Sequence, residues 1–365
     1  MQQAFGPACR AKRLPIVNKP TSRQTPPRLL SIVRAVLMCS GGGLMERSAQ
    51  LNFGVDVGKH ELVIASSVDQ RITKIANLPD AIGRWLGTLP ADCRVGMEAT
   101  GIYHQQLADL AHAAGHQVYV LNPRAVAVYL KSLRSRGKTD ILDARGIARY
   151  VQNEADEHPL YTPPSATQRS VQTLLHRRHQ VVKQRAALRM SCQSLDESVR
   201  APFAPLLVAF DQCLREIDSQ LRQRVRADEQ LLAQAARLRS IPGVGPLIST
   251  ALALRLSRHP YRNSDALVAA LGMDPRPHQS GVSEAPRHLS KQGNGEERRL
   301  IYMAAVSACR CALWRKRFDQ LIARGLPSTA AHCIIARKLL RIAFAINKNC
   351  QLYRAEVLGD DCRAT

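Results

Sequence analysis

The sequence is poor in aromatic residues and contains no long apolar run. Aromatic residues make up 4% of the 365 positions, and no stretch reaches the roughly 18 apolar residues that a membrane-spanning helix requires. An integral membrane protein is therefore excluded. Hydrophobic residues still form 45% of the chain, which excludes a fully disordered protein and allows about two to three packed domains.

The ten cysteines are scattered, and no Cys-x-x-Cys pair occurs. This spacing argues against a zinc site or a disulfide framework and favours reduced thiols. We therefore expect a cytoplasmic protein.

Acidic residues are also scarce relative to basic ones. Lys and Arg number 52 and Asp and Glu number 29, which gives a formal net charge of +23. Such a charge predicts a polyanionic partner, with nucleic acid as the leading candidate. Seven of the positive charges lie before Met45 in a segment without any acidic residue. We expect residues 1–50 to be a disordered basic tail, and Met45 is an alternative start of the protein.

Residues 51–157 alternate between strand and helix patterns. Apolar alternation predicts three successive strands and then strands that alternate with helices, in the order βββαβαβα. This order indicates a mixed sheet covered by helices. The predicted strands are 51–57, 60–68, 71–78, 94–99 and 117–122, and the predicted helices are 79–89, 101–115 and a segment from 124 that resumes at 139–152.

The second half of the chain reads as almost entirely helical. Residues 158–239 are predicted to comprise a proline-rich linker at 158–166 and then two long helices over 168–239 in a coiled-coil-like hairpin, a scaffold or dimerisation arm. Residues 240–353 form a further helical domain, followed by a tail at 354–365. Within that domain we expect short helices up to Met273, a loop from Asp274 to Gln292, a basic helix over 295–324 and a final helix over 328–348.

Four acidic residues occupy positions that suit a metal site on a sheet. Asp56 lies on the first strand, Glu98 ends the fourth, and Asp140 and Asp143 share one helix face. A lone carboxylate among Val and Gly is costly to bury, so Asp56 needs a compensating cation, either a divalent metal or Lys or Arg. Carboxylates hold Mg²⁺ well, and paired ions assist phosphoryl transfer. Taken singly, Asp140 could instead interact favourably with the dipole of its helix, and Glu98 could act as a cap.

Two segments of the C-terminal domain suggest contacts with phosphate. Ile241-Pro-Gly-Val-Gly-Pro246 resembles a helix-hairpin-helix turn, in which Gly243 and Gly245 would allow backbone N–H groups to approach a phosphate. The alternative is a tight turn between helices. Further on, Ser280 stands in a basic Gln-Ser-Gly loop, ahead of Ser290-Lys-Gln-Gly-Asn294. A loop serine alone is weak evidence for catalysis, and Ser283 and Ser290 are competitors.

These motifs together resemble a known family. Asp56, Glu98, Asp140 and Asp143, in this strand order, look like the DEDD set of a RuvC-like nuclease domain with an RNase H fold. The segments GVDVGKHE, MEATGIY and KTDILDA, with the later SG and SKxGN block, resemble the IS110 family of insertion-sequence transposases, including its IS1111-type members. The resemblance covers about Leu51 to Tyr353.

The resemblance implies a transposase or recombinase that cuts and rejoins DNA. It implies a Mg²⁺ or Mn²⁺ site on the four carboxylates and a covalent DNA link to Ser280. It also implies donor and target DNA, a guide (bridge) RNA and a homo-oligomer, dimer or tetramer, that works at the nucleoid. Nucleic-acid contacts are expected at Lys59, Lys138, Gly243, Gly245, Lys291, Asn294, Arg298, Arg299, Arg337 and Lys338.

Two alternatives remain open on the residues themselves. The first is a RuvC-like, structure-specific endonuclease that uses water, with Ser280 as a bystander. The second is a non-catalytic nucleic-acid-binding remnant of a mobile element. Arg337 and Lys338 could equally belong to a solvated helix face.

Overall fold

The computed structural model describes residues 50–69, 71–133, 139–280 and 283–354. The basic tail before residue 50, the possible start at Met45, Lys138 and the tail from 355 lie outside the described residues. In the part of the chain that is described, no helix is long and apolar enough to cross a membrane. By its internal contacts, the chain divides into residues 1–50 and residues 51–365.

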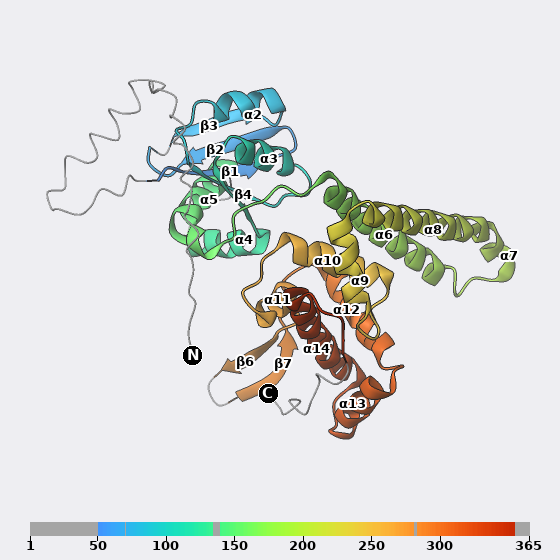
Figure 1. Cartoon of the computed structure of the whole chain (residues 1–365). Coiled ribbons are helices and arrows are strands. Elements are labelled where there is room, and N and C mark those ends of the chain that lie inside the picture. The colour runs from blue at the N-terminus through green and yellow to red at the C-terminus, as the bar shows by residue number, and fades with distance from the viewer. Residues whose placement is uncertain (1–49, 70, 134–138, 281–282, 355–365) are drawn as a thin grey trace, which may run out of the picture. The chain divides into compact units, whose positions relative to one another are not determined.

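A five-stranded mixed sheet forms the first domain (Figure 1). Its strands lie in the order β3-β2-β1-β4-β5, with β1 antiparallel to β2 and parallel to β4. The five strands predicted from apolar alternation are confirmed in number and order. Their bounds are β1 (Asn52–Val57), β2 (Glu61–Ser66), β3 (Ile72–Ala76), β4 (Arg94–Glu98) and β5 (Gln117–Leu121).

Helices cover both faces of this sheet. The helices α2 (Pro79–Leu86) and α3 (Gln105–Ala113) pack on one face, in a core with Val55, Val95 and Met97. On the other face, α5 (Asp140–Glu154) packs on β1, β2 and β4, and α4 (Pro123–Ser132) packs beside it. A short 3-10 turn (Ala155–Glu157) follows. The predicted βββαβαβα order is therefore confirmed.

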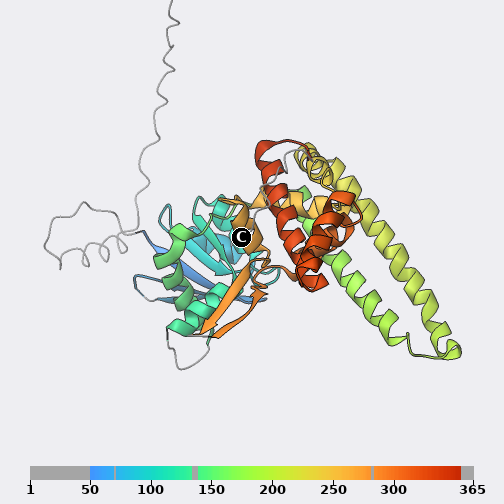
Figure 2. The ribbon, with the colours of Figure 1, turned by 90° about the horizontal axis from the view of Figure 1, so that it is seen from below.

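A pair of long helices follows the linker (Figures 1 and 2). The helices α6 (Ala166–Ser191) and α8 (Ala204–Arg226) pack against each other, joined by α7 (Glu197–Arg200) and a 3-10 turn (Ala201–Phe203). Arg178 pairs with Asp218 and Arg185 with Asp211 across this contact. The paired segment ends at Arg226, earlier than the predicted 239, because the Asp228 side chain caps a separate helix.

That separate helix, α9 (Glu229–Arg239), packs with the C-terminal helices. They are α10 (Pro246–Arg258), α11 (Ser264–Ala270), α12 (Gly295–Ala308), α13 (Ala312–Ala323) and α14 (Ser328–Asn349). Leu238, Leu252, Ile301 and Leu339 belong to one buried cluster that joins four of them. The predicted final helix is confirmed as α14.

Two predictions for this domain are wrong. The segment from Asp274 to Gln292 is not a loop, because it contains the antiparallel strands β6 (Pro275–Ser280) and β7 (Ser283–Leu289). The domain is thus not purely helical. The single basic helix over 295–324 is two helices, because Cys311 adopts an extended conformation between α12 and α13. Trp314, just after this break, is buried in the core.

Gly54 should be essential to this fold because α5 lies directly on it. A Cβ at this position would lie 2.3 Å from the Ala144 carbonyl and 2.1 Å from the Ala148 nitrogen. We predict that Gly54→Val lowers the free energy of unfolding by about 2–3 kcal/mol or more, measured by urea denaturation. Gly83→Ala is the control, since a Cβ there meets open space in α2 and should slightly stabilise the helix. Equal behaviour of the two variants would contradict the packing argument.

Candidate functional site

Asp56 and Glu98 lie on neighbouring parallel strands at the centre of the sheet. Val55 of β1 aligns with Met97 of β4, so each acidic residue directly follows this aligned pair. Val55 and Met97 are fully buried in the core beneath α2 and α3. Because successive side chains on a strand point to opposite faces, Asp56 and Glu98 face the side that α5 covers. Both residues are half-buried.

The first turn of α5 carries Asp140 and Asp143. Ala144, which follows Asp143, belongs to a buried cluster with Val63 of β2. Val63 is the residue directly across from Asp56 in the β1–β2 register. The start of α5 is therefore placed over the part of the sheet that carries Asp56.

The oxygen donors of this acidic set suit a hard divalent cation. Asp143 is half-buried, and Asp140 is exposed. Across the described ranges, no three His, Cys, Asp or Glu side chains form a group that could hold a metal ion. The fold therefore brings together the elements that carry the four carboxylates, without a complete coordination shell among the described residues.

Ser280 lies at the tip of a β-hairpin. It is the last residue of β6 and aligns with Ser283, the first residue of β7. The side chains of residues 277–287 lie outside the described part of the chain. The backbone places both serines beside the turn of this hairpin.

Ser290 lies at the base of the same hairpin. Its N–H donates to the carbonyl of Asp274 at 2.9 Å, and its hydroxyl hydrogen-bonds the Asp274 carboxylate. Arg276 Nη2 donates to Gln292 Oε1 at 2.7 Å. A Cβ at Gly293 would clash with the last carbonyl of α11. The Ser290–Asn294 segment therefore holds the hairpin base against α11, which gives Ser290 a structural partner.

Four of the predicted nucleic-acid contacts are exposed, and the charged ones among them are Lys59, Lys291 and Arg299, the fourth being Asn294. Lys59 lies in the turn after β1, next to the strand that carries Asp56. The Lys291 carbonyl accepts a hydrogen bond from Arg124 Nη1 at 3.1 Å. These exposed lysines and the arginine are free to meet solvent, as a phosphate contact requires.

Other predicted contacts have structural roles in the chain. The Asn294 side chain accepts from the N–H two residues on and caps α12. Arg298 Nη1 donates to the Leu271 carbonyl at 3.2 Å. Arg337 and Lys338 of α14 are half-buried, and burial, followed by the charge of Arg341, lowers the pKa of Arg337.

The two glycines before α10 differ. Gly243 has a φ of +85° and packs on α12, where a Cβ would lie 2.3 Å from the Ala304 carbonyl. Gly245 precedes the first residue of α10, and a Cβ there would meet open space. The close approach at Gly243 is thus made to a helix backbone, whereas the space beside Gly245 is open.

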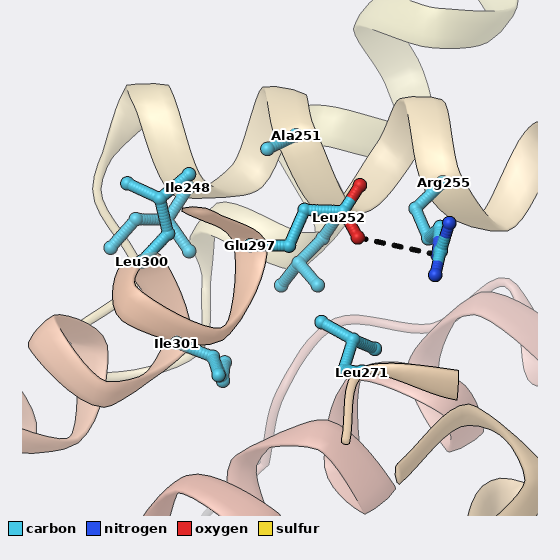
Figure 3. A pocket seen from close by; sticks show the side chains of 8 residues that line it. All are labelled: Ile248, Ala251, Leu252, Arg255, Leu271, Glu297, Leu300 and Ile301. Atoms are coloured by element: carbon cyan, nitrogen blue, oxygen red, sulfur yellow. Dashed lines mark ion pairs between the residues drawn. The ribbon is translucent and has the colours of Figure 1, made fainter. Parts of the chain in front are cut away.

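Sequence reasoning missed a half-buried ion pair between α10 and α12. Arg255 Nε lies 3.5 Å from Glu297 Oε2, and both face a small apolar pocket (Figure 3). Burial is the main cause that raises the pKa of Glu297, opposed by the charge of Arg255. The available signal was Arg255 and Arg258, three residues apart in the otherwise apolar helix α10.

The neighbouring Glu296 is also perturbed. Burial raises its pKa to about 7, with smaller opposing effects from Arg299 and Arg178. Its Oε1 atom lies 3.7 Å from Nδ1 of His179 on α6. Burial and the charge of Arg299 lower the pKa of that histidine. Near neutral pH, Glu296 is therefore close to half protonated beside a neutral imidazole.

Two profiles of transposase families match this chain. A transposase family profile matches residues 53–197, and the profile described as the transposase IS116/IS110/IS902 family matches residues 235–320. The first match contains all four acidic residues, and the second contains the hairpin with Ser280.

Individual relatives agree with the profiles. A pilin gene-inverting protein of Moraxella bovis is 30% identical over 68% of this chain and 78% of its own length. A probable family 20 transposase of Pseudomonas aeruginosa is 28% identical over 82% of this chain and 94% of its own. The transposase of insertion sequence element IS1111A from Coxiella burnetii is 28% identical over 54% of this chain and 60% of its own.

The raised pKa of Glu296 predicts a pH-dependent stability. The folded chain holds this proton up to about pH 7, while the unfolded chain releases it near the ordinary value of about 4.3. Stability from this group is therefore present at low pH and is lost as pH rises through this window. We predict that Glu296→Gln reduces the fall in unfolding free energy between about pH 5 and pH 8 by about 1–3 kcal/mol.

Urea denaturation across this pH range measures the effect. Glu216→Gln, at an exposed position of α8, is the matched control and should leave the pH profile unchanged. An unaltered profile for Glu296→Gln would show that the carboxyl ionises as readily in the folded chain as in the unfolded one.

Proposed function

Because the chain belongs to the IS116/IS110/IS902 family of transposases, we propose that it moves an insertion sequence by cutting and rejoining DNA with a metal-binding acidic site and a serine nucleophile. The placement of Asp56 beside Glu98, beneath the helix that carries Asp140 and Asp143, is the observation that carries this proposal. The family match implies a RuvC-like fold for the sheet domain, and the five-stranded mixed sheet agrees with it.

The four carboxylates are the proposed ligands of Mg²⁺ or Mn²⁺. A bound divalent ion would neutralise their mutual repulsion and the charge that develops on a reacting phosphate. Asp56 and Glu98 supply fixed oxygens from the sheet, and Asp140 and Asp143 supply oxygens from the helix. The exposed position of Asp140 leaves this edge open to a substrate.

Ser280 is the proposed nucleophile. Its hydroxyl oxygen forms a bond to the phosphorus of a DNA phosphodiester, and its proton passes to a base. The bond from phosphorus to one deoxyribose oxygen breaks, and that oxygen leaves as a strand-end hydroxyl. A hydroxyl from a second strand end reverses the step, so the phosphodiester energy is kept for rejoining. The backbone of Ser280 lies at the end of β6, opposite Ser283 of β7.

The proposed partners are donor and target DNA and a guide RNA encoded by the element. A net charge of +23 supports binding of phosphate backbones. Exposed Lys59, Lys291 and Arg299 are proposed contacts, together with Lys138, Gly243, Gly245, Asn294, Arg298, Arg337 and Lys338. The turn at Gly243 and Gly245 is proposed to contact phosphate in the manner of a helix-hairpin-helix motif. We place this activity in the cytoplasm, at the nucleoid.

A homo-oligomer, dimer or tetramer, is proposed to assemble through the α6–α8 hairpin in a coiled-coil-like manner. Apolar side chains are exposed near the end of this hairpin, with Met190 at 73% and Leu206 at 48% of full exposure. Val199, Phe203 and Val208 are exposed in the same region. A cluster of exposed apolar residues is typical of a protein interface. The domain boundaries are proposed as 51–157, 158–226 and 227–353.

The two alternatives are an endonuclease that uses water and a non-catalytic nucleic-acid-binding remnant. The acidic residues on the sheet are common to the first alternative and to the main proposal. The intact set of four carboxylates speaks against the second. The two reactions differ in whether DNA becomes covalently attached to the protein.

Ser280→Ala should abolish covalent attachment of DNA and strand exchange. The variant loses the attacking hydroxyl but keeps the acidic residues, so DNA binding should match the wild type. Trapped adducts on denaturing gels, followed by mass spectrometry of the attached peptide, measure the result.

Asp56→Asn should lower strand cleavage by a factor of about 10² or more, since a ligand of the proposed metal is lost.

Ser283→Ala is the matched control across the hairpin and should keep the adduct. Full cleavage by Ser280→Ala without any adduct would favour the endonuclease that uses water. Unchanged activity of Asp56→Asn would remove the acidic site from the mechanism.

Positive charge at the end of the α6–α8 hairpin should weaken self-association. We predict that the double variant Met190→Lys/Leu206→Lys lowers the average mass in solution, measured by light scattering, because burying two new charges opposes the interface. Leu232→Lys is the matched control, at an exposed leucine of α9. The same mass for all three proteins would place the interface elsewhere.

A further inference from the structure

A basic cleft lies where α6, α10 and the start of α12 meet the turn after β4. Its volume is about 330 Å³, which is in the range of pockets that hold small ligands. Gly101 and Ile102 line it, three and four residues after Glu98, and so does Asn294 of the Ser290–Asn294 segment. The cleft therefore touches segments that adjoin the acidic residues and the serine hairpin.

The lining of this cleft has more positive than negative charge. Arg169, Arg177, Arg255 and Arg258 line it, against Glu296 and Glu297. Arginine stays protonated even where burial lowers its pKa, as burial does for Arg258. Glu296 is near half protonation at neutral pH because burial raises its pKa to about 7. The carboxylates do not balance all four guanidinium groups, and the remaining positive charge favours an anion in the cleft.

Two of the residues that line the cleft, Arg255 and Glu297, form the ion pair that Figure 3 shows beside the neighbouring apolar pocket. Arg255 Nη2 also donates to the Ala270 carbonyl at 3.2 Å. Its Nε atom is buried and makes no hydrogen bond. Arg255 is therefore engaged within the fold, with Glu297 and the Ala270 carbonyl as its partners.

Each of the other three arginines of the cleft has a partner that is either a neutral amide or one carboxylate. Arg258 donates to Gln172 at 2.6 Å, and the exposed Arg177 donates to Gln180 at 2.8 Å. Neither pairing neutralises the guanidinium. Within the described ranges, Arg169 alone of these three arginines forms an ion pair, at 2.9 Å from Asp109. Arg177 and Arg258 are thus positioned to exchange an amide partner for a phosphate, which arginine binds more strongly.

We propose that this cleft is a subsite for one nucleotide of a single nucleic-acid strand, with Arg177 and Arg258 on its phosphate. The volume suits one nucleotide and excludes a duplex. The inference rests on the proposed function for the identity of the strand, which is either DNA leaving the acidic residues or the guide RNA. Both share the phosphodiester that the arginines recognise.

The test compares binding of labelled single-stranded DNA, single-stranded RNA and duplex DNA by fluorescence anisotropy at several salt concentrations. Arg177→Gln and Arg258→Gln should each weaken single-strand binding about tenfold. The two substitutions together should reduce the slope of log affinity against log salt by about 0.7, the value for one lost phosphate contact. The effect on DNA, RNA or both identifies which strand occupies the cleft.

Arg222→Gln, at an exposed position of α8, is the matched control and should leave the slope unchanged. A second variant, Thr173→Trp, fills the cleft from its exposed α6 wall without any change of charge. It should lower single-strand affinity and leave duplex binding intact. Thermal melting checks that each variant is folded.

Equal losses for Arg222→Gln and the cleft variants would overturn the proposal, as would equal losses for duplex and single strands. Ser280→Ala separates this inference from the catalytic one, because it should bind single strands with wild-type affinity and slope. Failure of Ser280→Ala to alter catalysis would therefore count against the nucleophile and leave the cleft inference standing.

Discussion

The close contact between α5 and the central strands is the constraint on which the sheet domain depends. Gly54 and Gly96 occupy aligned positions of β1 and β4, and each lacks the Cβ that would meet α5. The helix can therefore lie against the strand backbone itself. Asp56 and Glu98 come two residues later on the same face, so the contact that packs the domain also sets the distance between helix and carboxylates.

Charge is arranged differently in the two halves of the chain. In the sheet domain, Asp56 and Glu98 lie on the sheet face that α5 covers, and Asp140 and Asp143 lie in the first turn of α5. The helical half pairs most of its acids with arginine, as in Arg178 with Asp218 and Arg255 with Glu297. These pairs hold helices together and still leave a surplus of arginine for phosphate.

The sheet could be predicted from the sequence because its strands are short apolar runs between clear turns. Asp56 and Glu98 were found for the same reason, since an acid at the end of such a run stands out. The hairpin of β6 and β7 was missed because its strands contain Pro, Ser and Arg with no apolar alternation. Its pairing is supported by contacts of Ser290 and Gln292, which are distant in sequence from the strand they hold.

Local sequence patterns do not reveal the break between α12 and α13 or the basic cleft, because both features depend on tertiary packing. No Gly or Pro marks Cys311, and the break is explained by burial of Trp314 in the common core. Arg255 and Arg258 likewise read as ordinary charges on a helix until α6 and α12 are placed beside α10. A basic helix surface and a basic cleft can have the same local sequence pattern. Only tertiary packing distinguishes a charged side chain in solvent from one that lines a cleft.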